Sequence, residues 1–257
     1  MSEAKTPRRE PSRARVRVAG WGQSMARRMG YEIHPFIPDR GEVARRGKLL
    51  KHLGVTLVLD VGAATGVYVN QLRRIGYTGR VVSFEPLSSA YAKLSKNAAS
   101  DESWETRKQG VGPSVGTSEI HVSANFDSSS FLEMSDRHTQ SSPDSAYVDT
   151  ETVEVTTLDT IWNEIATPED RVYLKLDVQG YELEVMRGAE AALPQVVAMQ
   201  AELSLQPLYE GAPLYGEVID HLAERGFRLA GFEQGFEDLD TGETLQVDGV
   251  FVRADAR

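Results

Sequence analysis

A glycine-containing loop at residues 60–66, with the sequence DVGAATG, has the residue types of a small-ligand site. It directly follows a short apolar run. Gly62 permits a tight turn that a Cβ would obstruct, and Gly66 permits a close approach of backbone and ligand. Because the loop lacks the middle glycine of the dinucleotide fingerprint G-x-G-x-x-G, it favours a cofactor offering an amine and a carboxylate over a pyrophosphate. A purely structural tight turn would show the same pattern.

An acidic residue ends the next apolar run. Glu85 lies 25 residues after Asp60 and is followed by Pro86, which ends the strand and fixes the turn. In doubly wound nucleotide-binding folds, an acid about 20 residues beyond the glycine loop accepts the ribose hydroxyls. Two such signals on successive strands predict a cofactor that carries a nucleoside.

Charged residues interrupt a third apolar run. Lys175 and Asp177 alternate with apolar residues, and Glu202 ends the following run. Burying such charges costs several kcal/mol unless they are paired. The pattern therefore indicates either a structural ion pair, of Lys175 with Asp177 or with Glu182, or a site that faces the cofactor and its partner substrate.

The same residues are the candidates for catalysis. Asp177, Glu202 and Lys175 are expected near the ends of neighbouring strands, where one could remove a proton; our hypothesis is that Asp177 is the base or a metal ligand. Asp177 and Glu202 could together hold Mg²⁺ or another divalent cation through oxygen ligands. We favour a structural role over a metal. His121, His138 and His221 are weaker candidates.

Strands and helices alternate through most of the chain, which is typical of a three-layer α/β fold with a mainly parallel sheet. A polar, serine-rich segment at 127–149 is expected to be irregular. The expected strands are 55–61, 80–85, 106–111, 118–123, 153–156, 172–178, 196–203, 227–232 and 247–252, and the expected helices are 67–75, 90–99, 158–164, 182–192 and 215–225.

The charge of the chain is divided unevenly. Its 257 residues carry a formal net charge of −10, but residues 1–50 hold twelve Lys/Arg and five Asp/Glu. We expect a flexible basic arm at 1–20, an N-terminal helical cap at 21–54 and a cofactor-binding domain at 55–257. No aromatic residues separate the arginines of the arm, so no nucleic-acid partner is expected.

Composition narrows the class of protein further. The chain contains no cysteine, which excludes disulfides and Cys-ligated zinc. No apolar stretch approaches the roughly 20 residues needed to span a bilayer. A cytoplasmic protein is therefore expected. A homo-oligomer is compatible with the sequence, which does not determine the oligomeric state.

Together these motifs resemble the FkbM family of S-adenosylmethionine-dependent methyltransferases, over about residues 55–252. The resemblance implies a class I methyltransferase (Rossmann-like) fold, with a seven-stranded sheet whose last strand is antiparallel. It also implies O-methylation of a hydroxyl on a sugar or natural product. The motifs are Asp60-Val61-Gly62-Ala63 with Gly66, Phe84-Glu85-Pro86, Thr157-Leu158-Asp159, the string from Lys175 to Glu182, Gly188-Ala189, and Asp248-Gly249-Val250-Phe251-Val252.

The resemblance also implies roles for residues of the cofactor site. The loop residues Asp60, Gly62, Ala63 and Gly66 would shape the methionine end. Glu85, followed by Pro86, would hold the ribose, Val111 is expected at the adenine pocket, and Asp177 would face the cofactor. The family pattern does not identify a catalytic base.

The acceptor expected from the resemblance is a small molecule with a hydroxyl group, such as a sugar or a glycosylated natural product. It should lie over the strand ends and be covered by three segments: the cap, residues 125–149 and residues 206–216. Two alternatives stay open: a NAD-dependent oxidoreductase, in which Glu85 would hold the nicotinamide cofactor's ribose, and a non-catalytic protein that binds a nucleoside cofactor.

Overall fold

The computed structural model describes Arg28 and residues 41–256. Contacts divide the chain into two units, Met1–Gly41 and Glu42–Arg257, and the fold lies in the second. The arm expected at 1–20 and most of the cap expected at 21–54 lie outside the described residues. Within the described part of the chain, no helix has the length and apolar character needed to cross a membrane.

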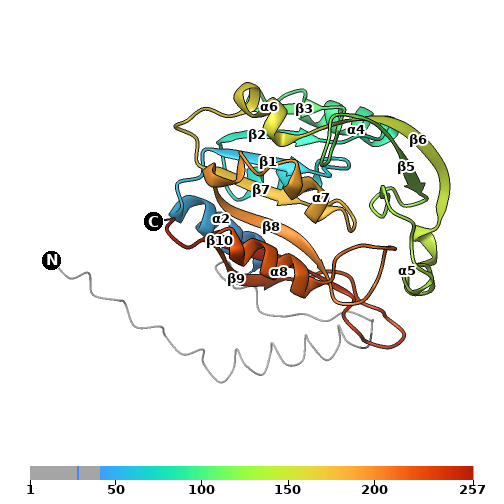
Figure 1. Cartoon of the computed structure of the whole chain (residues 1–257). Helices are drawn as coiled ribbons and strands as arrows, with labels where there is room; N and C mark the ends of the chain where they lie inside the picture. The colour runs from blue at the N-terminus through green and yellow to red at the C-terminus, as the bar shows by residue number, and fades with distance from the viewer. Residues whose placement is uncertain (1–27, 29–40, 257) are drawn as a thin grey trace, which may run out of the picture. The chain divides into compact units, whose positions relative to one another are not determined.

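A seven-stranded sheet forms the centre of the described unit (Figure 1). Every strand is parallel to the others except β10, which is antiparallel to both of its neighbours. This arrangement confirms the expected class I methyltransferase fold. The order across the sheet is β3 (Trp104–Arg107), β2 (Arg80–Phe84), β1 (Leu57–Val61), β7 (Val172–Leu176), β8 (Val196–Ser204), β10 (Gln246–Arg253) and β9 (Phe227–Glu233).

Helices cover both faces of this sheet, and each face has its own apolar core. The alternation of side chains along β1 shows the division, since Leu57 and Leu59 pack in one core and Val58 in the other. The run is apolar throughout because a parallel strand between two helical layers is buried on both faces. One face carries α6 (Leu158–Ile165), α7 (Glu182–Arg187) and α8 (Tyr215–Glu224); the other carries α2 (Glu42–His52), α3 (Val67–Arg74) and α4 (Ser88–Ala98).

Helix α2 belongs to the same compact unit as the sheet, although the sequence analysis placed residues 42–54 in a cap. Leu50 and Leu53, at and just beyond its C-terminal end, are buried in the core that contains Val58. Arg46 forms a buried ion pair with Glu233 of β9. These contacts join α2 to the sheet.

A second, three-stranded sheet lies between β3 and α6 along the chain. It consists of β4 (Gly110–Val111), β6 (Tyr147–Thr156) and β5 (Gly116–Ser123), in that order. The strand expected at 106–111 is thus two short strands that belong to different sheets.

The polar segment expected to be irregular contains a short helix, α5 (Asp136–Ser141). Ser135 caps it, because its side-chain oxygen accepts a hydrogen bond from the backbone N–H of His138. The helix has six residues and almost no apolar positions, so no hydrophobic period indicates it.

Candidate active site

The carboxyl ends of β1, β2, β7 and β8 meet at one edge of the large sheet, where ligands bind in folds of this kind. The loop after β1 passes directly over the end of β7. Gly62 has a φ of +76°, and a Cβ at this position would lie 1.8 Å from the backbone oxygen of Asp177. Only glycine allows so close an approach of the two backbones.

The second loop glycine serves packing. Gly66 has a φ of +83°, and a Cβ there would lie 2.6 Å from the ring of Trp104 on β3. Ala63 is likewise buried in the core beside α3. Both residues pack the loop against the core, on the side away from the pocket.

A pocket of about 340 Å³ opens at this edge of the sheet. Such a volume is within the range of small-molecule and cofactor sites. Of the residues expected to bind the cofactor, Gly62, Glu85, Pro86, Val111 and Asp177 line the pocket. Asp60, Ala63 and Gly66 lie behind this lining and support it.

Several lining residues were not predicted by the sequence analysis. Phe126 and Asp127, from the segment after β5, form part of the wall, and Phe131 joins Val111 and Ile120 on an apolar side of the pocket. The segment has no periodic pattern, so the sequence offered no signal for these positions.

Glu85 is 5% exposed and lies in the wall of the pocket. One carboxylate oxygen accepts a hydrogen bond from the N–H of Ala64 at 2.8 Å, and the other from the N–H of Leu87 at 2.9 Å. Burial raises the pKa of Glu85 to about 7, against the effect of these two bonds. Because each oxygen keeps a free lone pair, the carboxylate can still accept two ribose hydroxyls. This ribose assignment stays a prediction.

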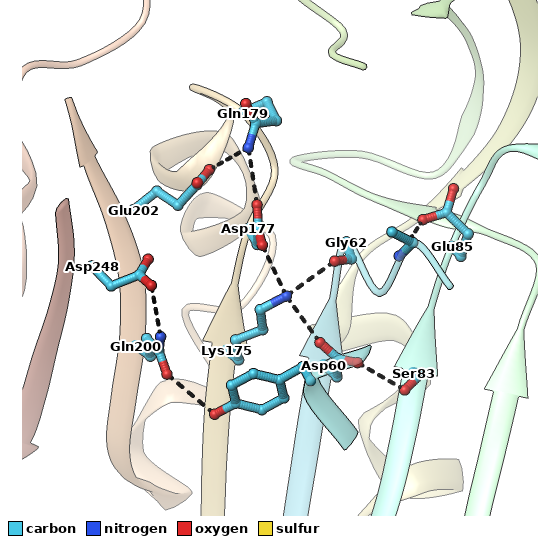
Figure 2. A network of polar contacts seen from close by, with 12 residues as sticks. Asp60, Gly62, Ser83, Glu85, Lys175, Asp177, Gln179, Gln200, Glu202 and Asp248 are labelled. Atoms are coloured by element: carbon cyan, nitrogen blue, oxygen red, sulfur yellow. Dashed lines mark hydrogen bonds and ion pairs between the residues drawn. The ribbon is translucent and has the colours of Figure 1, made fainter. Parts of the chain in front are cut away.

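Lys175 lies at the centre of an ion cluster in which Lys175 and Asp60 are buried and Asp177 is partly exposed (Figure 2). Its Nζ is 3.2 Å from Oδ1 of Asp60 and 3.1 Å from Oδ2 of Asp177, and it donates to the backbone oxygen of Gly62 at 3.1 Å. Ser83 donates to the other oxygen of Asp60 at 3.0 Å. The cluster connects the ends of β1, β2 and β7.

The charges of this cluster decide the role of Lys175. Burial opposes the charged form, but the carboxylates of Asp177 and Asp60 raise the pKa of Lys175 above its usual value. An ammonium group has no lone pair, and the side chain lies 8% exposed beneath the pocket. The structural pairing of Lys175 with Asp177 is therefore the arrangement observed, and it favours a positioning role for Lys175 over that of a base.

Gln179 connects the two carboxylates that face the pocket. Its Nε2 donates to Asp177 at 3.0 Å and to Glu202 at 2.8 Å, and its Oε1 accepts from the hydroxyl of buried Tyr209 at 2.6 Å. The residue has a φ of +53°, which is uncommon outside glycine and concentrates at functional sites. The sequence analysis gave Gln179 no role, and the only signal was its place between Asp177 and Gly180.

The protonation of the two carboxyl groups differs. Burial raises the pKa of Glu202 well above its usual value, and the nearby carboxylates of Asp177, Glu182 and Asp248 raise it further. For Asp177 burial acts in the same direction, but Lys175 outweighs it and lowers the pKa of Asp177. The surroundings thus shift the pKa values of the two carboxyl groups in opposite directions.

The metal site expected at Asp177 and Glu202 finds no support. The donor side of the Gln179 amide lies between the two carboxylates, where a cation would have to bind (Figure 2). Within Arg28 and residues 41–256, no group of three or more His, Cys, Asp or Glu residues could hold a metal ion.

Residues 60–229 match the family model described as the methyltransferase FkbM domain. The chain belongs to the FkbM methyltransferase family. This FkbM protein is thus an S-adenosylmethionine-dependent methyltransferase, and the alternative of a NAD-dependent oxidoreductase is set aside. The pocket fits that cofactor, since it has a glycine loop at the end of β1, a carboxylate at the end of β2 and an apolar wall.

Solved structures similar to this FkbM methyltransferase are distant in sequence. An rRNA methylase from Streptococcus thermophilus shares 12% identity at a TM-score of 0.44, with 86% of this chain and 99% of the other covered. Aeropyrum pernix fibrillarin, with natively bound S-adenosyl-L-methionine, shares 13% identity at a TM-score of 0.45, with 83% of this chain and 75% of the other covered. A SAM-dependent methyltransferase from Aquifex aeolicus shares 13% identity at a TM-score of 0.41, with 90% of this chain and 98% of the other covered. A search of curated proteins finds no significant match.

Proposed function

We propose that this methyltransferase methylates a hydroxyl oxygen of a small polar acceptor, such as a sugar or a glycosylated natural product. The observation that carries the proposal is the position of the Asp177 carboxyl group, which lines the pocket and pairs with Lys175 at 3.1 Å. Bound S-adenosylmethionine supplies an electrophilic methyl group. The protein must position the acceptor oxygen and receive its proton.

Asp177 is suited to receive that proton. A carboxylate with a lowered pKa is a weak base, but a hydroxyl oxygen becomes strongly acidic as it forms its new bond to carbon. The proton can therefore pass to Asp177 late in the reaction, and the carboxylate orients the hydroxyl before then. Glu202 and the Gln179 amide fix the position of Asp177 from the other side.

The charge around the site favours an acceptor without phosphate groups. The described lining of the pocket includes the acidic residues Asp127, Asp177 and Glu202 and contains no Lys or Arg. Proteins that bind nucleic acid use Lys and Arg to neutralise phosphates, which is the opposite arrangement. A neutral molecule rich in hydroxyl groups fits the site better.

The substitution Asp177→Asn tests this proposal. The amide keeps the shape of the side chain but cannot take up a proton, so we expect methyl transfer to fall by a factor of about 10²–10⁴. The measurement is transfer of a labelled methyl group to small molecules of a cell extract, with product identification by mass spectrometry. Binding of S-adenosylhomocysteine, measured by calorimetry, should change by no more than a few-fold.

Asp220→Asn, an exposed position on α8, is the matched control and should leave turnover unchanged. Full turnover by Asp177→Asn would exclude Asp177. A labelled product methylated on nitrogen or carbon would contradict the O-methyl assignment. Tight cofactor binding by the unmodified protein without any labelled product would favour the non-catalytic alternative.

A further inference from the structure

Tyr209 lies in the connection between β8 and α8, and it is only 1% exposed. Its ring packs in a small apolar cluster with Leu208 and Leu245. The ring of His138 meets it edge to face, with the two centroids 5.2 Å apart. A buried tyrosine needs a hydrogen-bond partner for its hydroxyl group. The partner of Tyr209 belongs to the candidate active site.

The hydroxyl group of Tyr209 has two acceptors within reach. Its oxygen is 2.6 Å from Oε1 of Gln179 and 3.3 Å from the backbone oxygen of Ser128. Burial raises the pKa of Tyr209, so the hydroxyl keeps its one proton at neutral pH. The shorter distance assigns that proton to the bond with Gln179. Tyr209 therefore determines on which side of the Gln179 amide the oxygen lies.

The orientation of this amide matters because its nitrogen uses both hydrogens within the site. Nε2 of Gln179 donates to Asp177 and to Glu202, and Figure 2 shows the amide linked to both carboxyl groups. An amide turned by half a rotation would place its oxygen against the two carboxyl groups, which would both lose their donor. Tyr209 and the two carboxyl groups thus select the same orientation.

The backbone of Gln179 is held as closely as its side chain. Its φ of +53° is uncommon outside glycine and persists only where the surrounding structure imposes it. The hydroxyl of buried Ser130 donates to the backbone oxygen of Gln179 at 2.7 Å. At the next residue, Gly180, an added Cβ would lie 2.8 Å from the Cβ of Ala212. The turn after β7 is therefore fitted closely against the connection that carries Tyr209.

The connection that carries Tyr209 is anchored in turn to the segment before α5. The N–H of Ser135 donates to the backbone oxygen of Leu208 at 2.9 Å, and the N–H of Glu210 donates to the backbone oxygen of Glu133 at 2.8 Å. These two bonds lie on either side of Tyr209 along the chain. They fix the position from which its hydroxyl group reaches Gln179.

We propose that Tyr209 is a positioning residue for methyl transfer. Acting through the Gln179 amide, its hydroxyl group holds the carboxyl group of Asp177 where that group meets the acceptor oxygen. Tyr209 is not part of the described lining of the cofactor pocket, so its effect on the reaction passes through Gln179. The inference rests on the proposed function, in which Asp177 receives the acceptor proton. A misplacement of about 1 Å can slow an enzyme reaction by about 10²-fold.

The first measurement observes the Gln179 amide directly. The full chain is labelled with ¹⁵N at the glutamine side chains, and Gln179→Met identifies the signals by removing them. We expect the Gln179 amide hydrogens to exchange with solvent at least about tenfold more slowly than those of exposed Gln206. Tyr209→Phe keeps the ring but removes the donor to Oε1, so it should speed this exchange by about tenfold.

The second measurement is methyl transfer to the small molecules of a cell extract, compared at one extract concentration. Gln179→Met should lower the rate by about 10²-fold and Tyr209→Phe by about tenfold. The double variant should be as slow as Gln179→Met alone, because the hydroxyl acts only through the amide. In Tyr209→Phe the affinity for S-adenosylhomocysteine should stay within about twofold.

Tyr215→Phe is the matched control. The sequence Pro-Leu-Tyr occurs at 207–209 and again at 213–215, and Tyr215 is exposed. This variant should change neither amide exchange nor methyl transfer. Unchanged exchange of the Gln179 amide in Tyr209→Phe would overturn the proposal. A double variant slowed further, by the full factor of Tyr209→Phe, would overturn it too and would show that Tyr209 acts by packing alone.

These measurements separate the inference from the proposed function. If the unmodified protein yields no methylated product, the proposed function fails, and amide exchange alone decides whether Tyr209 orients Gln179. If Tyr209→Phe does not fold, the unmodified protein decides. Its Tyr209 hydroxyl proton, buried and donated to Gln179, should exchange slowly enough to give an NMR signal of its own at low temperature. Absence of that signal would overturn the proposal.

Discussion

Glu85 combines burial with two hydrogen bonds from the backbone, and the balance between them sets its charge. The carboxylate is stabilised by the N–H groups of Ala64 and Leu87, yet burial still raises its pKa to about 7. If Glu85 binds the ribose as predicted, the ribose hydroxyls donate to its ionised form. Cofactor affinity should therefore depend on pH in the physiological range.

We predict that affinity for S-adenosylhomocysteine falls as the pH decreases through about 7, by roughly tenfold for each pH unit below the pKa of Glu85. The sign follows from protonation, which removes an acceptor that the ribose needs. Glu85→Gln should weaken binding by about 10–100-fold at pH 8 and flatten the dependence. Calorimetry between pH 5.5 and 8.5 measures both. An unchanged pH profile in Glu85→Gln would exclude Glu85 as the titrating group.

The loop between β1 and α3 shows how an element, rather than one side chain, builds the site. Gly62 brings this loop against the backbone of Asp177, so the cofactor loop and the proposed base are placed by the same contact. A shift of either segment moves the other.

Gly62→Ala should therefore impair both cofactor binding and methyl transfer. The added Cβ would lie 1.8 Å from a backbone oxygen, so the loop or the end of β7 must move. We expect the affinity for S-adenosylhomocysteine to fall by more than tenfold, which corresponds to more than about 1.4 kcal/mol of binding free energy. Methyl transfer should be lost as well. Gly216→Ala is the control, because a Cβ there meets nothing within 4 Å. Equal cofactor affinity in Gly62→Ala and the unmodified protein would contradict the account.

The elements of the large sheet were mostly predictable, whereas those between β3 and α6 were not. The runs around Leu57–Val61 and Val172–Leu176 are apolar because both faces are buried, so their pattern predicts strands. The long strand β6 has mostly exposed residues over its first half, and only its end at 153–156 was predicted. The helix expected at 182–192 ends at Arg187. Gly188 follows, where a Cβ would lie 2.0 Å from the backbone oxygen of Gly112.

At the scale of the whole molecule, α2 closes one end of the core rather than standing apart. Arg46 reaches Glu233 on β9 and lies over the ring of Tyr68 at 4.6 Å. Both charged residues are 6% exposed. Removing one partner of such a pair leaves an uncompensated buried charge.

Arg46→Met should consequently destabilise the entire unit by about 3–5 kcal/mol. Urea unfolding, followed by circular dichroism, is expected to remain a single transition with a lowered midpoint, because α2 unfolds together with the sheet. Arg45→Met is the matched control: this neighbouring side chain is exposed and, within the described part of the chain, its hydrogen bond is to a backbone oxygen at 3.3 Å, so its effect should stay within about 0.5 kcal/mol. A separate early transition in Arg46→Met would show that α2 folds independently.

The sequence by itself determined the strands and helices of the large sheet and its two covering layers, with the positions of Gly62 and Glu85 at neighbouring strand ends. Both follow from local rules, the period of buried strands and the backbone freedom of glycine. Only the tertiary structure decided that Lys175 lies beneath the pocket, that Gln179 separates Asp177 from Glu202, and that Tyr209 bonds to Gln179. These contacts join residues distant along the chain. These contacts form only when the layers pack against one another, and layer packing produces no periodic pattern in the sequence from which the contacts could be predicted.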